Sequence, residues 1–502
     1  MSLKPKAKGA LLLRRASGFI RVLTHNRRAS VGIGILVFFT FVALFPSLLT
    51  PYDPIIQREK IATDKTYPTW LKYLPGYENT SENLFPIQDP KFSQATALQE
   101  WAFTPSPANQ NLTLRYVPDV GSSNDTRPGC IAIDFQRSKD EPAQEVKATL
   151  TKEFYYPYKS PPKRYIGQIY LKADGVKNVS TWGVEARVFI QTDTEKRYVW
   201  TARQGGNNSG DWIAPDIFGS TIRYLPKIDS NIIDQLVTAF SKQTNYVYGV
   251  EVTFNREVQN ATVFIDDLDL RLYGSAFGLL GTDDIGRDIF TQLVYGTRIS
   301  LIVGLLAAFI SVTLGLVVGL VSAYMGKFID EALMRFTDML LVLPELALLM
   351  VIIAVLGPSI WYIILLLGIL GWMGFARTVR SQALSLKERP FVEAAKAVGA
   401  GRIHIIMRHI LPNVMNLVYV TLAMTVPAAI MGEAYLSFLG LYDPSIMTWG
   451  RMFHEALDLP QGAQRWWWVI PPGFAIALIS ITFVLVGYAL DEILNPQLRQ
   501  RH

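Results

Sequence analysis

Acidic residues inside apolar stretches are the groups in this sequence whose chemistry is most distinctive. Asp338 and Glu345 fall in or beside one long apolar segment, and Glu433 falls in another. An ionised carboxylate is costly in a hydrocarbon layer, so such residues mark function by default. They could line a passage for a polar solute or lock helices together. The alternative is a position near the membrane surface, hydrogen-bonded to a neighbouring helix; for Glu433 we favour a structural role.

Two further groups of acids could ligate calcium through carboxylate oxygens. Asp266, Asp267 and Asp269 share one segment with strand-like alternation, and three more acids lie within residues 283–288. Because successive strand residues point to opposite faces, we expect the first three to be solvent-facing strand residues. The second group lacks the alternating ligand spacing of a calcium loop. The sequence therefore predicts no metal site.

No familiar catalytic motif occurs in the chain. Its one Gly-Lys pair, Gly326-Lys327, is followed by Phe328, so a phosphate-binding loop is absent. There is no Gly-x-Ser-x-Gly elbow and no His-Glu-x-x-His motif, and the five histidines are scattered. We therefore predict no catalytic residue and no cofactor in this chain. A pump driven by ATP and magnesium would have to hold them on other chains.

The elements that must position the intramembrane acids are long apolar helices. Half of the 502 residues are apolar and 18% are charged. About 20 helical residues cross a hydrocarbon core. That length predicts six spans, of which the fifth can tilt or break near Pro427; they are 31–49, 299–325, 336–357, 359–376, 413–440 and 468–490.

Positive charge sets the expected orientation of these spans. Residues 1–30 carry eight lysines and arginines and no acid, and the loop 377–408 is also strongly basic. Both segments are therefore predicted to be cytoplasmic. Six spans then place both termini inside and residues 55–275 outside. The net charge of +6 thus reports orientation, and no nucleic-acid partner is expected.

The segment 55–275 has the pattern of a folded external domain. Its short alternating runs and turn signals predict a β-sandwich, and residues 231–241 predict a helix. Trp182, Trp200 and Trp212 either stack on sugars or, as we favour, fill the core. The closing run 261–273 resembles the last strand of jelly-roll carbohydrate-binding modules. The expected strands are 130–135, 146–154, 166–173, 183–192, 197–203, 246–254 and 261–273.

All six Asn-x-Ser/Thr sequons of the chain fall in this segment, which agrees with an external location. We predict possible N-glycosylation at these positions. They are Asn79, Asn111, Asn124, Asn178, Asn207 and Asn260. The single cysteine, Cys130, excludes an intrachain disulfide.

The loop 388–412 joins two spans on the predicted cytoplasmic side. It reads as two short helices broken at Gly399-Ala400-Gly401, with Pro390 suited to the first helical turn. Its Glu-Ala-Ala triplet, its glycine and its closing Ile-Leu-Pro resemble the EAA loop of ABC-transporter permeases. The resemblance implies that this loop docks on a cytoplasmic ATPase. The implied coupling residues are Glu393, Ala394, Ala395, Gly399 and Pro412.

Several other blocks carry a resemblance to a narrower family. Residues 280–301 begin Leu-Gly-Thr-Asp-Asp-Ile-Gly-Arg-Asp, where Thr282 or Asp283 can cap a short helix. This block, with 334–338, 432–441 and Trp449-Gly450, resembles the C-type membrane subunit of dipeptide/oligopeptide permeases. The resemblance implies a type I ABC importer fold. It also implies a homologous partner permease, two ATPases and an external solute-binding protein.

The resulting expectation is an α-helical membrane protein with six transmembrane helices and an inserted, mostly-β extracellular domain. The expected parts are a basic cytoplasmic N-terminus (1–30), a first span (31–49), the insert (55–275) and a permease core (276–495). The chain would be a plasma-membrane subunit of an importer for peptides or related oligomers. An oligosaccharide importer of the same family is one alternative. Others are a membrane-tethered carbohydrate-binding or adhesion protein and a secondary transporter, for neither of which the coupling loop has a use.

Overall fold

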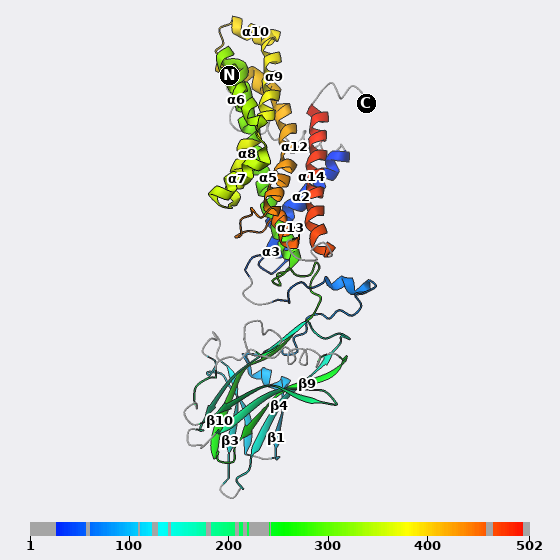
Figure 1. Ribbon diagram of the computed structural model, residues 1–502, viewed down its shortest axis with the longest axis vertical. Coiled ribbons are helices and arrows are strands. Elements are labelled where there is room, and N and C mark those ends of the chain that lie inside the picture. Colours follow the sequence, from blue (N-terminus) through cyan, green and yellow to red (C-terminus); the bar gives the residue numbers. More distant parts are fainter. Residues whose placement is uncertain are drawn as a thin grey trace, which may run out of the picture. The chain divides into compact units, whose positions relative to one another are not determined.

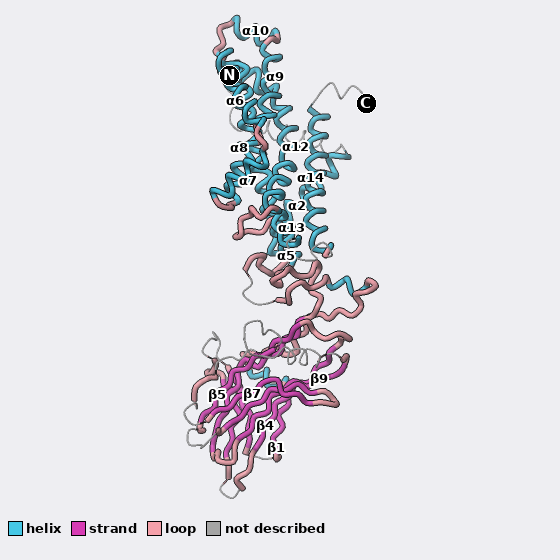
Figure 2. The backbone as a smooth tube through the Cα atoms, in the orientation of Figure 1, coloured by secondary structure: helices cyan, strands magenta, loops and turns pink. Residues whose placement is uncertain are grey.

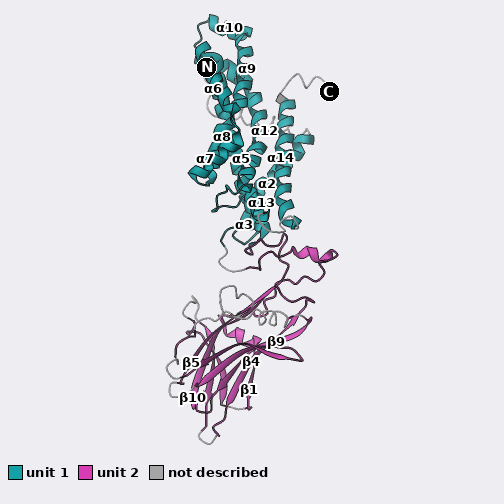
Figure 3. Cartoon of the chain, in the orientation of Figure 1, with its two compact units in different colours: residues 1–59, 287–502 teal, residues 60–286 magenta. Residues whose placement is uncertain are grey.

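The computed structural model describes residues 27–56, 61–108, 111–122, 129–138, 142–176, 182–205, 210–213, 218–219, 240, 242–457 and 465–494. The chain divides into two compact units, residues 1–59 with 287–502 and residues 60–286 (Figure 3). In the described ranges the first unit is helical, and the second is built mainly from strands (Figure 2). The second unit includes most of the predicted insert and continues to Gly286.

The helical unit contains long apolar helices joined by short ones (Figure 1). α5 begins where the Asp288 carboxylate accepts a hydrogen bond from the Thr291 backbone NH at 2.9 Å. The described helices are α2 (Arg27–Leu44), α3 (Pro46–Leu49), α5 (Ile289–Met325), α6 (Lys327–Val342), α7 (Glu345–Leu356), α8 (Ile360–Leu370), α9 (Met373–Lys387), α10 (Pro390–Ala397), α11 (Arg402–Ile405), the π-helix η4 (Ile406–Ile410), α12 (Leu411–Phe438), α13 (Trp449–Leu457) and α14 (Trp466–Leu494).

Five helical segments in the described ranges are long and apolar enough to cross a membrane, and a bent pair brings the number to six. The five are Arg27–Leu44, Ile289–Met325, Ile360–Lys387, Arg402–Phe438 and Trp466–Ile493. Five of the six predicted spans overlap these segments, and the sixth, 336–357, overlaps the bent pair. α12 remains helical through Pro427, so the break considered there does not occur.

The predicted span 336–357 is the exception, because it is not one helix. α6 and α7 meet at a bend of 83°. Leu343 leaves the helical conformation, with φ −72° and ψ 134°, because the ring of Pro344 crowds the residue before it. The hydropathy pattern located the apolar segment correctly but did not show its change of direction.

α5 is the central helix of the bundle and packs closely against α9. Added β-carbons on Gly315 and Gly319 would lie 2.8 Å and 2.7 Å from the carbonyl oxygens of Trp372 and Ala376. The i, i+4 spacing of these glycines therefore brings the two backbones together, as small residues do in membrane helices.

The second unit is a sandwich of two five-stranded antiparallel sheets. Their strand orders are β1-β4-β9-β6-β7 and β2-β3-β10-β5-β8. All seven predicted strands are present, and three more occur. The strands are β1 (Ala102–Ser106), β2 (Leu112–Val117), β3 (Cys130–Gln136), β4 (Val146–Tyr156), β5 (Arg164–Asp174), β6 (Val184–Gln191), β7 (Lys196–Gln204), β8 (Phe218–Gly219), β9 (Thr244–Phe254) and β10 (Asn260–Tyr273). The predicted helix 231–241 lies outside the described residues except for Phe240.

The inner faces of the two sheets share an apolar core. Phe135 of β3 stacks on Phe254 of β9, with ring centroids 4.8 Å apart. Trp200 packs against this core, and Trp212 packs on a smaller cluster around Cys130. Both tryptophans are half-buried, as is Trp182, which lies beneath the Arg203 guanidinium. The core-filling expectation thus fits Trp200 and Trp212 only in part.

The expectation that the acids of β10 face solvent is wrong. Asp266, Asp267 and Asp269 are all buried. A bulge interrupts the pairing of β10 with β5 between Asp266 and Asp269, and Asp267 has φ +50°. The Asp266 carboxylate accepts the backbone NH of Ser122 at 2.7 Å, so local irregularity keeps this acid hydrogen-bonded inside. No group of acids, histidines and cysteines that could hold a metal occurs among the described residues.

The base of the sandwich is closed by hydrogen bonds between its first and last segments. Leu84 and Leu272 exchange backbone hydrogen bonds of 2.8 Å and 2.9 Å. The Thr282 hydroxyl donates to the Thr63 carbonyl at 2.6 Å. Thr282 therefore joins two segments, and the short helix expected after it is replaced by a turn.

Three of the six sequons can be placed in the structure. Asn79 and Asn260 are exposed, and Asn111 is half-buried. Asn124, Asn178 and Asn207 lie outside the described residues. Glycosylation at all six positions stays a prediction.

Candidate functional site

The loop between α9 and α12 has the predicted helix–glycine–helix form. α10 begins with Pro390 in its first turn, and α11 begins after Gly401. Figure 1 shows α10 at one end of the helical unit, with α13 near the opposite end. The π-helix Ile406–Ile410 then leads into α12. Pro412 lies in the first turn of α12, where its lack of a backbone NH is tolerated. Residues 388–412 thus form a compact element rather than an extended connection.

One face of this loop is anchored on the ends of the long helices. Val392 and Ile405 are buried in an apolar cluster with Tyr324 of α5 and Val379 of α9. The Lys387 ammonium donates to the Ala323 carbonyl at 3.1 Å. The loop is therefore held to the membrane helices, and a force applied to it would reach α5 and α9.

The other face is exposed and apolar. Val398 and Ile403 are 89% and 70% exposed, and Phe391 and Met407 are exposed beside them. Glu393, Ala394 and Pro412 are also exposed, while Ala395 is half-buried. In the described part of the chain, the Glu393 carboxylate has no ion pair or hydrogen bond. An uncovered apolar patch with a free acid at its edge is the form of a protein-docking surface.

Gly399 gives the loop its sharp change of direction. It ends α10 with φ +86°, and its NH bonds to the Lys396 carbonyl at 2.9 Å. Residues with a β-carbon rarely adopt this left-handed conformation. Nothing lies within 4 Å of the position a β-carbon would take on Gly399 or on Gly401, whose φ is −68°. Only the backbone of Gly399 therefore demands glycine.

The three acids predicted near the membrane lie in different environments. Asp338 of α6 pairs with Arg377 of α9, whose Nε donates at 3.1 Å. Elsewhere on the same two helices, the Arg380 guanidinium donates two hydrogen bonds, of 2.5 Å and 2.6 Å, to the two carboxylate oxygens of Asp330. This geometry supports the helix-locking interpretation of Asp338.

Glu433 and Glu345 differ from Asp338 and from each other. Glu433 is 1% exposed, and its Oε1 accepts the Ser437 hydroxyl at 2.6 Å. That burial within the bundle supports the structural role favoured for it. Glu345 instead lines an open cavity of about 520 Å³ between α5, α7, α8 and α12.

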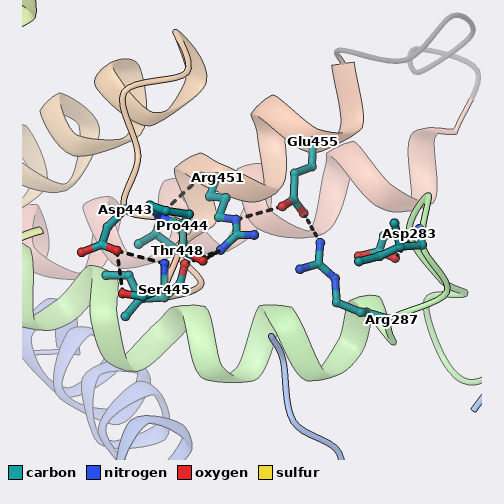
Figure 4. A network of polar contacts seen from close by, with 10 residues as sticks. Asp283, Arg287, Asp443, Pro444, Ser445, Thr448, Arg451 and Glu455 are labelled. Carbon is teal, nitrogen blue, oxygen red and sulfur yellow. Dashed lines mark hydrogen bonds and ion pairs between the residues drawn. The ribbon is translucent and has the colours of Figure 1, made fainter. Parts of the chain in front are cut away.

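A buried polar network at the opposite end of the bundle was not predicted from the sequence. Arg451 donates to Glu455 Oε1 at 2.8 Å and to the carbonyls of Pro444 and Ile446 at 2.9 Å and 2.8 Å (Figure 4). Arg287 donates to the other oxygen, Glu455 Oε2, at 2.8 Å. One carboxylate therefore joins α13 to the start of α5. The i, i+4 spacing of Arg451 and Glu455 could have indicated their ion pair within a helix. The contact with Arg287 could not be read from spacing, because Arg287 is 168 residues from Glu455.

Asp443 orders the loop that leads into this network. Its carboxylate accepts the Ser445 hydroxyl at 2.6 Å and the Ile360 NH at 3.3 Å. Partial burial acts to raise the pKa of Asp443, but these hydrogen bonds and the nearby Arg451 charge outweigh it and hold the pKa below its usual value. The loop carboxylate thus stays ionised beside the arginine.

Comparison with known proteins identifies the class to which these features belong. A family described as "Binding-protein-dependent transport system inner membrane component" matches residues 311–500. That range includes the 388–412 loop, most residues that line the cavity, and Arg451. Residues 16–75 match "N-terminal TM domain of oligopeptide transport permease C". The chain is thus a multi-pass membrane permease subunit of an ABC importer.

Individual relatives narrow the family. The dipeptide transport system permease protein DppC of Bacillus subtilis is 40% identical over 227 residues, covering 45% of this chain and 71% of the relative. The oligopeptide transport system permease protein OppC of Haemophilus influenzae is 37% identical over 238 residues, covering 46% and 76%. The chain belongs to the dipeptide/oligopeptide ABC permease family and carries a large β-sandwich insertion.

A solved structure of the carbohydrate-binding module TmCBM61 with β-1,4-galactotriose is also similar. It covers 37% of this chain and 97% of its own at 12% identity, with a TM-score of 0.22. This score is too low to bear on the function of the insertion.

Proposed function

We propose that this chain forms half of the translocation pathway of an importer for peptides or related oligomers. A homologous permease would supply the other half, two ATPases would bind the cytoplasmic loops, and an external solute-binding protein would deliver the cargo. The observation that carries this proposal is the 388–412 loop, which is anchored on α5 and α9 and exposes an apolar face. ATP-driven movement of the ATPases would then shift the bundle between two conformations of different stability.

The test is uptake by the complete importer. The two permeases, the ATPases and the cognate binding protein are reconstituted in liposomes with ATP inside. Uptake of a labelled oligopeptide that requires both ATP and this chain supports the proposal. Uptake of an oligosaccharide but not of peptides would support an oligosaccharide importer and contradict the proposal that peptides are the cargo.

We further propose that both termini are cytoplasmic and that residues 55–275 are external. The basic residues of 1–30 and of the docking loop support this orientation. A protease site inserted in the exposed turn Asp193–Glu195, between β6 and β7, should be cleaved in intact cells. A second site fused after His502 should be cut only after lysis. Cleavage of the first site only from the cytoplasmic side would reverse the topology.

The sandwich is proposed to receive the binding protein or its cargo. Its own apolar core and its place between the first two spans support this role. Because Leu84 and Leu272 are hydrogen-bonded neighbours, residues 85–271 can be replaced by a short Gly-Ser turn. We expect this variant to insert normally but to lose most binding-protein-dependent uptake. Unchanged uptake at saturating and limiting binding protein would reduce the sandwich to a spacer.

A further inference from the structure

The cavity that contains Glu345 lies near the middle of the helical spans. Its walls include Ser311 near the centre of α5 and Thr425 near the centre of α12. Leu349, Leu367 and Tyr435 supply apolar and aromatic surface. A volume of about 520 Å³ falls within the range of sites that hold small ligands. The cavity is open, as one half of a pathway would be before its partner encloses it.

Among the described residues that line this cavity, Glu345 is the only charged one. Asp338 is neutralised by Arg377, and Glu433 is buried against Ser437. Among the described residues, the Glu345 carboxylate has neither an ion pair nor a hydrogen bond. The cavity therefore presents one carboxyl group without a protein partner, among neutral side chains.

The broken helix explains why an acid is stable at this depth. A helix break within a membrane is tolerated where it borders protein or a water-filled cavity, because the freed backbone groups need polar partners. The 83° bend between α6 and α7 lies directly before Glu345. The first turn of α7 would by itself attract anions. Because Glu345 places a carboxyl group in that turn, the helix start favours a cation instead of an anion.

We propose that Glu345 recognises a positively charged group of the cargo, a peptide ammonium or a lysine or arginine side chain, as it passes through the pathway. This inference rests on the proposed import of peptides. A charged group of the cargo would lose hydration in the apolar cavity, and the carboxylate would replace part of it. Glu345 is thus a specificity residue of the permease, acting after the binding protein has released its cargo.

The test compares two cargo peptides that differ only by lysine or glutamine at one position, both bound by the same receptor. Glu345→Gln removes the charge and keeps the shape. We expect uptake of the lysine peptide to fall about tenfold, the effect of one modest charge pair. Uptake of the glutamine peptide should change less than about twofold. Glu331→Gln, an exposed α6 glutamate outside the cavity, should leave both rates unchanged.

Other results would overturn the inference. An equal loss of uptake for both peptides, or no loss for either, would show that Glu345 does not distinguish cargo by its charge. Weaker assembly of Glu345→Gln with the partner permease would assign its charge to a subunit contact. If the unmodified importer takes up no peptide at all, the proposed function fails instead.

Thiol labelling provides a test that does not depend on transport. Cys130 is buried, and burial raises its pKa to about 12, so the natural thiol is unreactive. Labelling will therefore report only on a thiol introduced at position 345. Because this position lines the open cavity, Glu345→Cys in the assembled complex should react with a water-soluble thiol reagent, and lysine peptide should slow the reaction. A thiol at this position that stays unreactive with and without ATP would exclude Glu345 from the pathway.

Discussion

Replacing Gly399 with valine is expected to abolish coupling between ATP hydrolysis and uptake while the subunit still inserts. Gly399 ends α10 at φ +86°, a conformation that a β-branched residue adopts only with strain of roughly 1–3 kcal/mol. The chain can relieve that strain by rotating or unwinding α10. Either change moves Glu393 of α10 and the neighbouring Val398 relative to Ile405, which anchors α11. We therefore expect cargo-stimulated ATP hydrolysis and uptake to fall at least about tenfold, since a misplaced coupling contact of 1.4 kcal/mol already has that effect.

The neighbouring glycine provides a matched control. Gly401→Val introduces the same side chain in the same loop, where φ is −68° and no atom lies within 4 Å of a new β-carbon. We expect this variant to retain most of its stimulated hydrolysis. Both variants are compared in reconstituted complexes at equal subunit content. Normal stimulated hydrolysis in Gly399→Val would contradict the assignment of this loop to coupling.

Replacing Glu455 with alanine is expected to destabilise the helical unit strongly. Arg451 and Arg287 are nearly buried, with side-chain exposures of 8% and 5%, and both pair with this carboxylate. Its removal takes away the carboxylate to which both buried guanidinium groups donate. Loss of one partner from a buried ion pair typically costs about 3–5 kcal/mol. Thermal unfolding of the purified subunit in detergent should show a clear fall in midpoint.

Another arginine–glutamate pair allows the effect of burial to be isolated. Glu331 and Arg335 have the same i, i+4 spacing, but their side chains are 54% and 76% exposed. Exposed pairs contribute about 0–1 kcal/mol, so Glu331→Ala should barely move the midpoint. Equal shifts for Glu331→Ala and Glu455→Ala would refute the view that the buried network holds α13 to α5.

Local sequence was sufficient to predict the secondary structure that carries the function. The apolar runs located the spans, because a hydrocarbon core imposes a minimum length on helices. Alternating residues located seven strands, since strand residues alternate between two faces. The two-helix loop was readable from Pro390 and Gly399, because each has backbone preferences that do not depend on distant contacts.

Tertiary structure decided which acids are available for function. Asp338, Glu345 and Glu433 all lie in or beside apolar segments of the sequence. In the structure, Asp338 is paired across helices, Glu433 is buried, and Glu345 lines a cavity. The buried acids of β10 depend on a bulge in its pairing with β5, and Glu455 binds an arginine 168 residues away. Periodicity reports which face of an element a residue occupies. The partner brought to that face is set by packing and bending, and that partner determines whether a charge is locked, buried or free to meet a solute.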